Sequence, residues 1–291
     1  AGCIEDPFWR DNETEALKIM DNEFVYSHAF SVDGEFLDSE VILLRCQGLD
    51  TLAEIWINGE LAGTANNMHR IWEYDVKKLL RAGENRIVVQ FSSPTKYIKE
   101  AYARSRADGT SDAMTGFPLL RKAHCMFGWD WGPRLPDAGI WRPIELLGID
   151  TARIRDVLIL QDHTKAPEQV VLRVQTHVNY LSPNGQRSPQ GQISSQDQLS
   201  PQDQRSPQDH LSPQNQPGHL SRLNDSETQI EVTVTGPEGE TYPVDEHGIT
   251  VIRSPKLWWP AGFGEQPLYT VRVTLKSGER VLDSQEKRIG L

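Results

Sequence analysis

The segment Phe127-Gly128-Trp129-Asp130-Trp131-Gly132-Pro133 combines residue types that suit the recognition of a sugar. Two indole rings flank one carboxylate, and glycine or proline stands on both sides. An indole face packs against the C–H side of a sugar ring, and a carboxylate accepts hydrogen bonds from hydroxyl groups. Gly128, Gly132 and Pro133 predict an irregular backbone that presents these side chains outward instead of pleating them into a sheet.

The same segment also fits a purely structural role. A tryptophan-rich corner can close the end of a β-sandwich, because indole rings bury a large apolar area. The residue types alone do not separate this interpretation from a sugar-binding surface, so both stay open at this point.

Length, charge and hydropathy restrict the class of protein. A chain of 291 residues corresponds to about two domains. The net charge is −11 and basic residues do not cluster, so we expect neither nucleic acid nor an anionic membrane surface as a partner. No apolar run approaches the ~18 residues needed to span a bilayer. The first residues also lack the basic region and apolar core of a signal peptide.

The three cysteines, Cys3, Cys46 and Cys125, are far apart in the sequence. None has a neighbour at metal-ligand spacing, so we expect no metal site, and no organic cofactor is suggested. We expect Cys46 to be buried in a strand. Cys125 is predicted to be core filler rather than a nucleophile, because no His-Asn or His-Asp order surrounds it. Such cysteine usage fits a reduced, cytoplasmic setting.

Short alternating strands dominate the first half of the chain. They are predicted over residues 23–32, 40–46, 53–57, 70–76, 85–91 and 139–147. Asn58-Gly59 predicts a type I′ hairpin turn, which needs positive φ at both central residues. A short helical turn is expected at 77–81. The one helical or irregular excursion is expected within 95–115, where Lys96, Glu100 and Arg104 suit a solvated face. The pattern predicts an antiparallel sandwich or jelly roll.

A second all-β unit is expected over residues 150–291, with the character of a small immunoglobulin-like sandwich. Its strands are predicted over 153–160, 169–178, 229–235 and 269–275. Between the second and third of these lies a six-residue repeat that begins Ser182-Pro183-Asn184-Gly185-Gln186-Arg187. Its Ser, Pro, Gln and Asp bury too little apolar surface to offset the entropy of ordering. We therefore expect a disordered insert at about 180–226.

Four segments match one known family in their order and spacing. They are residues 4–13 (IEDPFWRDNE), residues 48–59 (GLDTLAEIWING), residues 127–133 with 139–142, and residues 257–269 with 287–291. The second resembles a hairpin shared across glycoside hydrolase family 2, and the third is more particular to its β-mannosidase branch. The last resembles the sandwich domain that precedes the family's catalytic barrel. The chain as a whole therefore resembles the N-terminal part of a family 2 β-mannosidase.

The resemblance implies an all-β fold in two parts. A galactose-binding-like jelly roll would occupy residues 1–149, with its first strand missing, and an immunoglobulin-like β-sandwich would occupy residues 150–291. The (β/α)8 barrel with both catalytic glutamates would follow beyond residue 291, so we expect no catalytic residue in this sequence. Such enzymes cleave terminal β-D-mannose from oligosaccharides with retention, using two carboxyl groups ~5–5.5 Å apart. The partners implied are thus a β-mannoside oligosaccharide and the barrel of the same polypeptide.

The resemblance also implies roles for the tryptophan motif. In the resembling enzymes this loop reaches over the barrel mouth, so Trp129 would form an aromatic wall of the mannose pocket and Asp130 would accept hydrogen bonds from the sugar. Trp131, with Trp141, would pack to hold the loop. Asn12-Glu13 and Asn22-Glu23 mimic the dipeptide of the family's acid/base. Neither is assigned chemistry, because Glu13 is expected in a loop and both dipeptides precede any barrel strand.

Three functions remain to be separated. The first is the N-terminal, non-catalytic portion of an exo-acting retaining β-mannosidase, which the incomplete first strand and the end at Leu291 favour. The second is a stand-alone carbohydrate-binding β-sandwich module without catalysis. The third, a β-sandwich scaffold, leaves the Trp-Asp-Trp segment unexplained.

Overall fold

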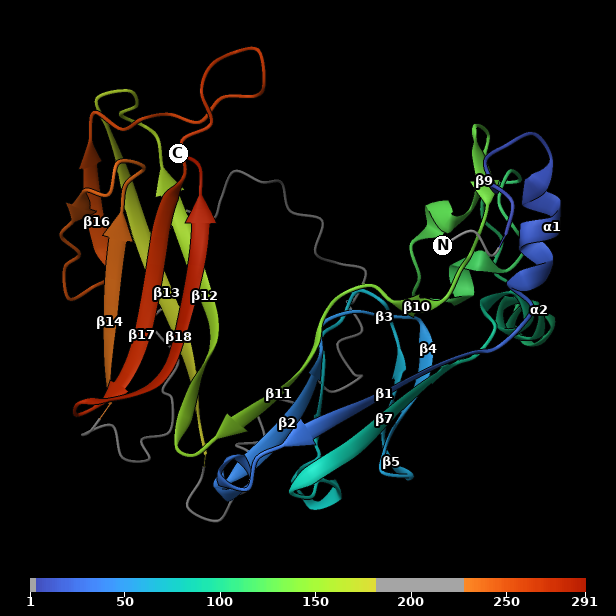
Figure 1. Cartoon of the computed structure of the whole chain (residues 1–291). Coiled ribbons are helices and arrows are strands. Elements are labelled where there is room, and N and C mark those ends of the chain that lie inside the picture. Colours follow the sequence, from blue (N-terminus) through green and yellow to red (C-terminus); the bar gives the residue numbers. More distant parts are fainter. Residues whose placement is uncertain (1–3, 182–227) are drawn as a thin grey trace. The chain divides into compact units, whose positions relative to one another are not determined.

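The computed structural model describes residues 4–181 and 228–291 and shows two compact units, residues 1–149 and 150–291 (Figure 1). The disordered insert expected at about 180–226 lies almost wholly outside the described residues, as does Cys3. Both units are built mainly of antiparallel strands, so the predicted all-β fold class is confirmed.

The first unit contains two α-helices, several 3-10 turns and eleven strands within its described residues. The helices are α1 (Asn12–Ile19) and α2 (Pro94–Arg104), and the 3-10 turns are η1 (Glu35–Asp38), η2 (Lys77–Leu79), η3 (Phe117–Leu119) and η4 (His124–Met126). The strands are β1 (Phe24–Val32), β2 (Val41–Cys46), β3 (Leu49–Asp50), β4 (Leu52–Ile57), β5 (Glu60–Asn66), β6 (Trp72–Asp75), β7 (Gly83–Phe91), β8 (Phe127–Trp129), β9 (Gly132–Arg134), β10 (Gly139–Ile140) and β11 (Ile144–Ile149).

The core of the first unit lies between two sheets, with strand orders β1-β7-β4-β5 and β11-β2-β6. Alternate residues of each strand point to one face, so Ile55 and Ile57 of β4 and Phe91 of β7 meet Ile42 and Cys46 of β2 in one apolar cluster. All five are 0% exposed. Burial raises the pKa of the Cys46 thiol to about 12, so this predicted core residue is a neutral one.

The hairpin between β4 and β5 turns at Asn58-Gly59 as the sequence predicts. Asn58 has a φ of 52° and Gly59 a φ of 89°, the positive pair that a type I′ turn requires. The Asn58 amide also donates to the Leu79 oxygen at 2.9 Å and to Asn85 Oδ1 at 2.8 Å. The turn is therefore fixed both by its own backbone and by contacts with η2 and β7.

The helices differ in how well the sequence predicts them. Helix α2 begins one residue before the expected 95–115 excursion and otherwise lies within it. Ser93 caps it by accepting from Lys96 N, Pro94 occupies its first turn, and the predicted solvated face is exposed. Helix α1 was not predicted, and the expectation that Glu13 lies in a loop is wrong. Its acidic first turn suits the helix dipole, but it buries only one side chain fully within its bounds, so the apolar periodicity is weak.

The closing strand predicted over 139–147 is interrupted. Strand β10 pairs with β3, and β11 pairs with β2, on either side of Trp141-Arg142-Pro143. Pro143 has no N–H to donate to a ladder, which favours a break at this point. Trp141 N still donates to Gly48 O at 3.2 Å, and Gln47 N donates to Pro143 O at 3.0 Å. The chain therefore crosses from one small sheet to a larger one without leaving the domain.

The second unit packs two sheets around an apolar core. Its strands are β12 (Ala152–Asp162), β13 (Gln169–Tyr180), β14 (Thr228–Thr235), β15 (Thr241–Tyr242), β16 (Ile249–Arg253), β17 (Tyr269–Ser277) and β18 (Arg280–Ile289). The strand orders are β12-β13-β16 and β15-β14-β17-β18. Leu172 and Ile252 of one sheet and Val273 and Leu275 of the other are 0% exposed, and the C-terminal Leu291 packs into the same cluster.

Three strands of this unit, β15, β16 and β18, were not predicted. Strand β18 is an edge strand rich in charged residues, and most of its side chains are exposed. Edge strands of this kind lack apolar alternation, so only the pairing with β17 reveals it. Neither α-helix in the described part of the chain has the length and apolar character needed to cross a membrane.

Candidate functional site

The tryptophan motif folds as a short β-hairpin at one end of the first unit. Phe127 pairs with Arg134 and Trp129 with Gly132, which leaves Asp130 and Trp131 as the connecting residues at the tip. The expectation of an irregular, unpleated backbone is therefore wrong. The glycine has another use: Gly128 adopts a φ of 110°, and a Cβ there would lie 2.7 Å from Arg134 Cγ. Glycine thus permits both the backbone angle and the close approach of the two strands.

Trp129 and Asp130 lie next to each other at the exposed tip of this hairpin. The Trp129 side chain is 46% exposed, and Asp130 is also exposed. Within the described residues, the Asp130 carboxylate accepts no hydrogen bond and forms no ion pair. An indole ring and an unengaged hydrogen-bond acceptor are therefore adjacent on the surface, where they could contact a polar ligand that has an apolar side.

The packing role expected for Trp131 is wrong. Its side chain is 82% exposed, and its ring contacts Trp129, with centroids 5.6 Å apart and planes inclined at 58°. Trp141 does pack on the domain: a Cβ on Gly48 would lie 2.6 Å from Trp141 Nε1, so the indole covers that glycine. The two tryptophans thus have separate environments, one at the tip of the hairpin and one on the wall of the domain.

A small apolar cluster anchors the base of the hairpin. Phe127 is 0% exposed and packs with Ile98 of α2, Phe117 and Leu120. The Phe117 and Phe127 ring centroids are 6.1 Å apart. Cys125, which was predicted to be core filler, is exposed instead, because the chain turns through η4 just before Phe127 enters the cluster. The hairpin is therefore fixed at its base and open at its tip.

Helix α1 also contacts the hairpin, at β9 (Figure 1). Glu13 Oε1 accepts a hydrogen bond from Arg134 N at 3.0 Å. Glu23, the other family-like glutamate, accepts from Gln90 Nε2 at 3.0 Å on the first sheet. Both side chains thus make hydrogen bonds within the first unit.

A buried ion pair that involves Lys122 was not predicted from the sequence. Lys122 is 0% exposed at its side chain and forms an ion pair with Asp50, which is 7% exposed. Lys122 Nζ also donates to the main-chain oxygen of Asp137 at 2.7 Å. The pKa of the Asp137 carboxyl is raised: partial loss of hydration raises it, the Lys122 ammonium opposes this, and the Asp50 carboxylate raises it further. No local pattern signals a contact between residues 72 positions apart.

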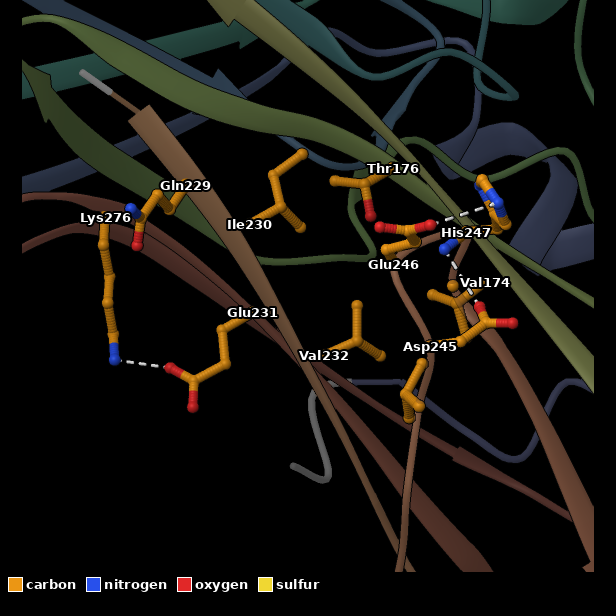
Figure 2. A pocket seen from close by; sticks show the side chains of 12 residues that line it. Val174, Thr176, Gln229, Ile230, Glu231, Val232, Asp245, Glu246, His247 and Lys276 are labelled. Atoms are coloured by element: carbon orange, nitrogen blue, oxygen red, sulfur yellow. Dashed lines mark hydrogen bonds and ion pairs between the residues drawn. The ribbon is translucent and has the colours of Figure 1, made fainter. Parts of the chain in front are cut away.

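A pocket of ≈ 710 Å³ lies in the second unit, beside β14. Figure 2 shows that polar side chains of this pocket pair with one another, Lys276 with Glu231 and His247 with Glu246. None of its lining residues is Trp, Tyr or Phe, so it offers no stacking surface. In the described ranges, no three His, Cys, Asp or Glu side chains gather as metal ligands would. The hairpin is therefore the better candidate site.

Comparison with known families matches each unit in turn. Residues 1–142 match the description "Glycosyl hydrolase 2 galactose-binding domain-like", and residues 152–291 match "Glycosyl hydrolases family 2". The chain belongs to glycosyl hydrolase family 2. The resemblance stated from the sequence is thereby confirmed, and so is the fold class of a galactose-binding-like domain followed by a sandwich domain.

The chain is also similar to individual members of the family. Beta-mannosidase B of Neosartorya fischeri is 27% identical over 99% of this chain, and Beta-mannosidase A of Aspergillus terreus is 28% identical over 100%. The crystal structure of a β-D-mannosidase from Dictyoglomus thermophilum aligns with 100% of this chain at a TM-score of 0.71 and 27% identity, covering 32% of that chain. The fold is shared by an FMN-binding β-glucuronidase from Facaelibacterium prausnitzii. That structure is 16% identical and aligns with 93% of this chain, and with 32% of its own, at a TM-score of 0.55. The chain spans about 30% of the length of the curated relatives it matches.

Proposed function

We propose that this chain is the N-terminal, non-catalytic portion of an exo-acting retaining β-mannosidase that hydrolyses terminal β-D-mannose from oligosaccharides. The tip of the β8–β9 hairpin carries the proposal, because it presents Trp129 beside an unengaged Asp130 carboxylate. The similarity to β-mannosidases over the whole chain supports this substrate class. Trp129 and Asp130 would contribute one loop to the substrate pocket.

Each side chain of the hairpin tip has a separate task in this proposal. The Trp129 face would cover the apolar side of the terminal sugar, and the Asp130 carboxylate would accept hydrogen bonds from its hydroxyls. Both actions bind and orient the sugar without breaking a bond. The two carboxyl groups needed for retention would come from a C-terminal (β/α)8 domain of the same polypeptide. The free thiols of Cys46 and Cys125 fit the cytoplasmic setting expected from the sequence.

The test is substitution of Asp130 in the protein that also contains the catalytic domain. Asp130→Ala leaves sugar hydroxyls unpaired in a pocket largely closed to water, which costs about 2–4 kcal/mol of transition-state binding. We expect kcat/KM for an aryl β-mannoside to fall on the order of 30- to 1000-fold. Asp33→Ala, at an exposed carboxylate in the β1–η1 connection, is the matched control. Equal kcat/KM for the two variants would exclude the proposed role of Asp130.

A stand-alone carbohydrate-binding module is the second candidate. The observation that favours it is that Trp129 and Asp130 are exposed within this chain itself, so a sugar can reach them. Titration calorimetry of residues 1–291 with mannose and a β-linked mannobiose separates the two. A module binds saturably and loses binding on Trp129→Ala. One wall of a shared pocket shows no saturable binding by itself, because most of its contacts belong to the other domain.

A further inference from the structure

The ammonium group of Lys122 joins the two ends of the segment that carries the tryptophan hairpin. Lys122 lies before η4 and β8, and Asp137 lies after β9. Lys122 Nζ donates to Asp137 O at 2.7 Å and lies 3.8 Å from Asp137 Oδ1. A single buried cation therefore bridges the start and the end of residues 123–136, in addition to the apolar contacts of Phe127 at the base of the hairpin.

The third partner of Lys122 belongs to the frame of the domain. Asp50 ends β3, where it pairs with Gly139 of β10, and its side chain is 7% exposed. One carboxylate oxygen of Asp50 accepts a hydrogen bond from the Lys122 ammonium, and the other accepts one from the Thr51 hydroxyl. Strand pairing thus fixes Asp50, and Asp50 holds the Lys122 ammonium in place. Lys122 in turn holds the end of the hairpin segment at Asp137.

Stability alone does not account for such a cluster. Removing a lysine and an aspartate from water costs several kcal/mol, and a buried ion pair is often no more stabilising than apolar residues of the same volume. A buried ion pair restricts the conformation of the segments that carry it. Arrangements that separate the two charges leave a buried charge unpaired, which is strongly unfavourable. Fixing direction matters here, because the tip of the hairpin is exposed: Trp129 is 46% and Trp131 82% exposed.

We propose that Lys122 is a positioning residue that sets the direction of the β8–β9 hairpin, and thereby the location of Trp129 and Asp130 in the sugar pocket. The effect on the hairpin is independent of any activity. The effect on the sugar rests on the function proposed above. The two parts are measured separately, so failure of one is distinguishable from failure of the other.

The first measurement is hydrogen exchange on the chain. Lys122→Met leaves the buried Asp50 carboxylate without its counter-ion and is expected to lower Tm by several degrees. The double variant Lys122→Met with Asp50→Asn removes that unpaired charge, so its Tm is expected to return close to that of the unsubstituted chain. In the double variant we expect amides of residues 123–136, such as Leu135 N, to exchange at least about tenfold faster, with β7 amides unchanged.

Two variants serve as controls. Asp137→Asn retains the main-chain oxygen that Lys122 contacts, so exchange within 123–136 is expected not to accelerate. Lys99→Met removes an exposed lysine of α2 and is expected to change neither Tm nor exchange. If the double variant recovers its Tm and also keeps slow exchange in 123–136, Lys122 contributes only to stability and the inference is overturned.

The second measurement uses the protein that contains the catalytic domain. A positioning role predicts that the double variant loses kcat/KM by about tenfold or more at unchanged Tm, approaching the loss in Asp130→Ala. If exchange accelerates and kcat/KM stays normal while Asp130→Ala is impaired, Lys122 does not position the sugar contact and that part of the inference is overturned. If Asp130→Ala is also fully active, the proposed function fails, and accelerated exchange still supports the role of Lys122 in orienting the hairpin.

Discussion

The ammonium of Lys122 and the main-chain oxygen of Asp137 are 2.7 Å apart, and this contact closes the base of the segment that holds Trp129 and Asp130. Lys122 is simultaneously paired with Asp50, which strand pairing fixes opposite Gly139. The exposed tip of the hairpin therefore stands on a base held by the buried side chains of Lys122 and Phe127. A binding surface that stands on a rigid base loses less conformational entropy when it meets a ligand.

Trp129 is expected to act through its ring face. In the protein that contains the catalytic domain, we predict that Trp129→Ala lowers kcat/KM for an aryl β-mannoside by about tenfold or more, because the aromatic wall is lost. Trp129→Phe keeps an aromatic face and is expected to retain most of the activity. Steady-state kinetics and thermal unfolding are measured together. Unfolding of the first unit by Trp129→Ala, with full activity in the molecules that stay folded, would show that the ring is structural.

Residues 1–291 on their own are predicted to have no glycosidase activity. Hydrolysis with retention needs two carboxyl groups on opposite sides of the scissile bond. Glu13 is hydrogen-bonded to Arg134 N and Glu23 to Gln90, on different elements of the first unit. The measurement is chromophore release from an aryl β-mannoside by the purified chain. Turnover that disappears in Glu13→Gln or Glu23→Gln would contradict this prediction.

Phe127 is predicted to be the most sensitive position of the hairpin for stability. Its ring is 0% exposed among Ile98, Phe117 and Leu120, so Phe127→Ala leaves a cavity at the base of the hairpin. We expect a loss of about 3–5 kcal/mol in the free energy of unfolding of the first unit, measured in urea. Phe263→Ala is the control, since that ring is 81% exposed, and its effect is expected to stay within about 0.5 kcal/mol.

Asp137 is predicted to make stability depend on pH in the direction opposite to most carboxylates. Its pKa in the folded chain is raised above the usual 3.8, so ionisation is less favourable in the folded than in the unfolded state. Stability from this group is present below its unfolded pKa and is lost as pH rises through the folded pKa. Asp137→Asn is therefore expected to raise the free energy of unfolding at pH 7, and this gain should vanish in acid.

Asp162 is predicted to make stability depend on pH in the opposite direction to Asp137. Its pKa is lowered, first by the hydrogen bond from Thr164 N at 2.9 Å, so the ionised form is favoured in the folded chain. Stability from this group is present above its unfolded pKa and is lost as pH falls through the lowered folded value. Asp162→Asn is expected to lower the free energy of unfolding at pH 7 and to have no effect in strong acid. Parallel behaviour of the two variants across pH would contradict at least one of the two assignments.

Local patterns in the sequence determined much of the fold. Strands with one apolar face, such as β4 and β7, were predicted because side chains alternate across a sheet with a period of two. The Asn58-Gly59 turn was predicted because few other residues adopt positive φ at two successive positions. The four family-like segments also identified the family, because their residues and their order can be read from the sequence alone. The roles of Trp129 and Asp130 stay a prediction.

Only the tertiary structure decided which side chains meet. Edge strand β18 and helix α1 carry weak apolar periodicity, so their partners, and not their own residues, reveal them. The resemblance implied that Trp131 packs, but at the tip of the hairpin its side chain is 82% exposed. Lys122 and Asp50 are 72 positions apart, and the pairing of β3 with β10 places Asp50 opposite Gly139, near Asp137, the other partner of Lys122. Such contacts depend on the pairing of distant strands, which is a property of the whole domain and leaves no mark in a local stretch of sequence.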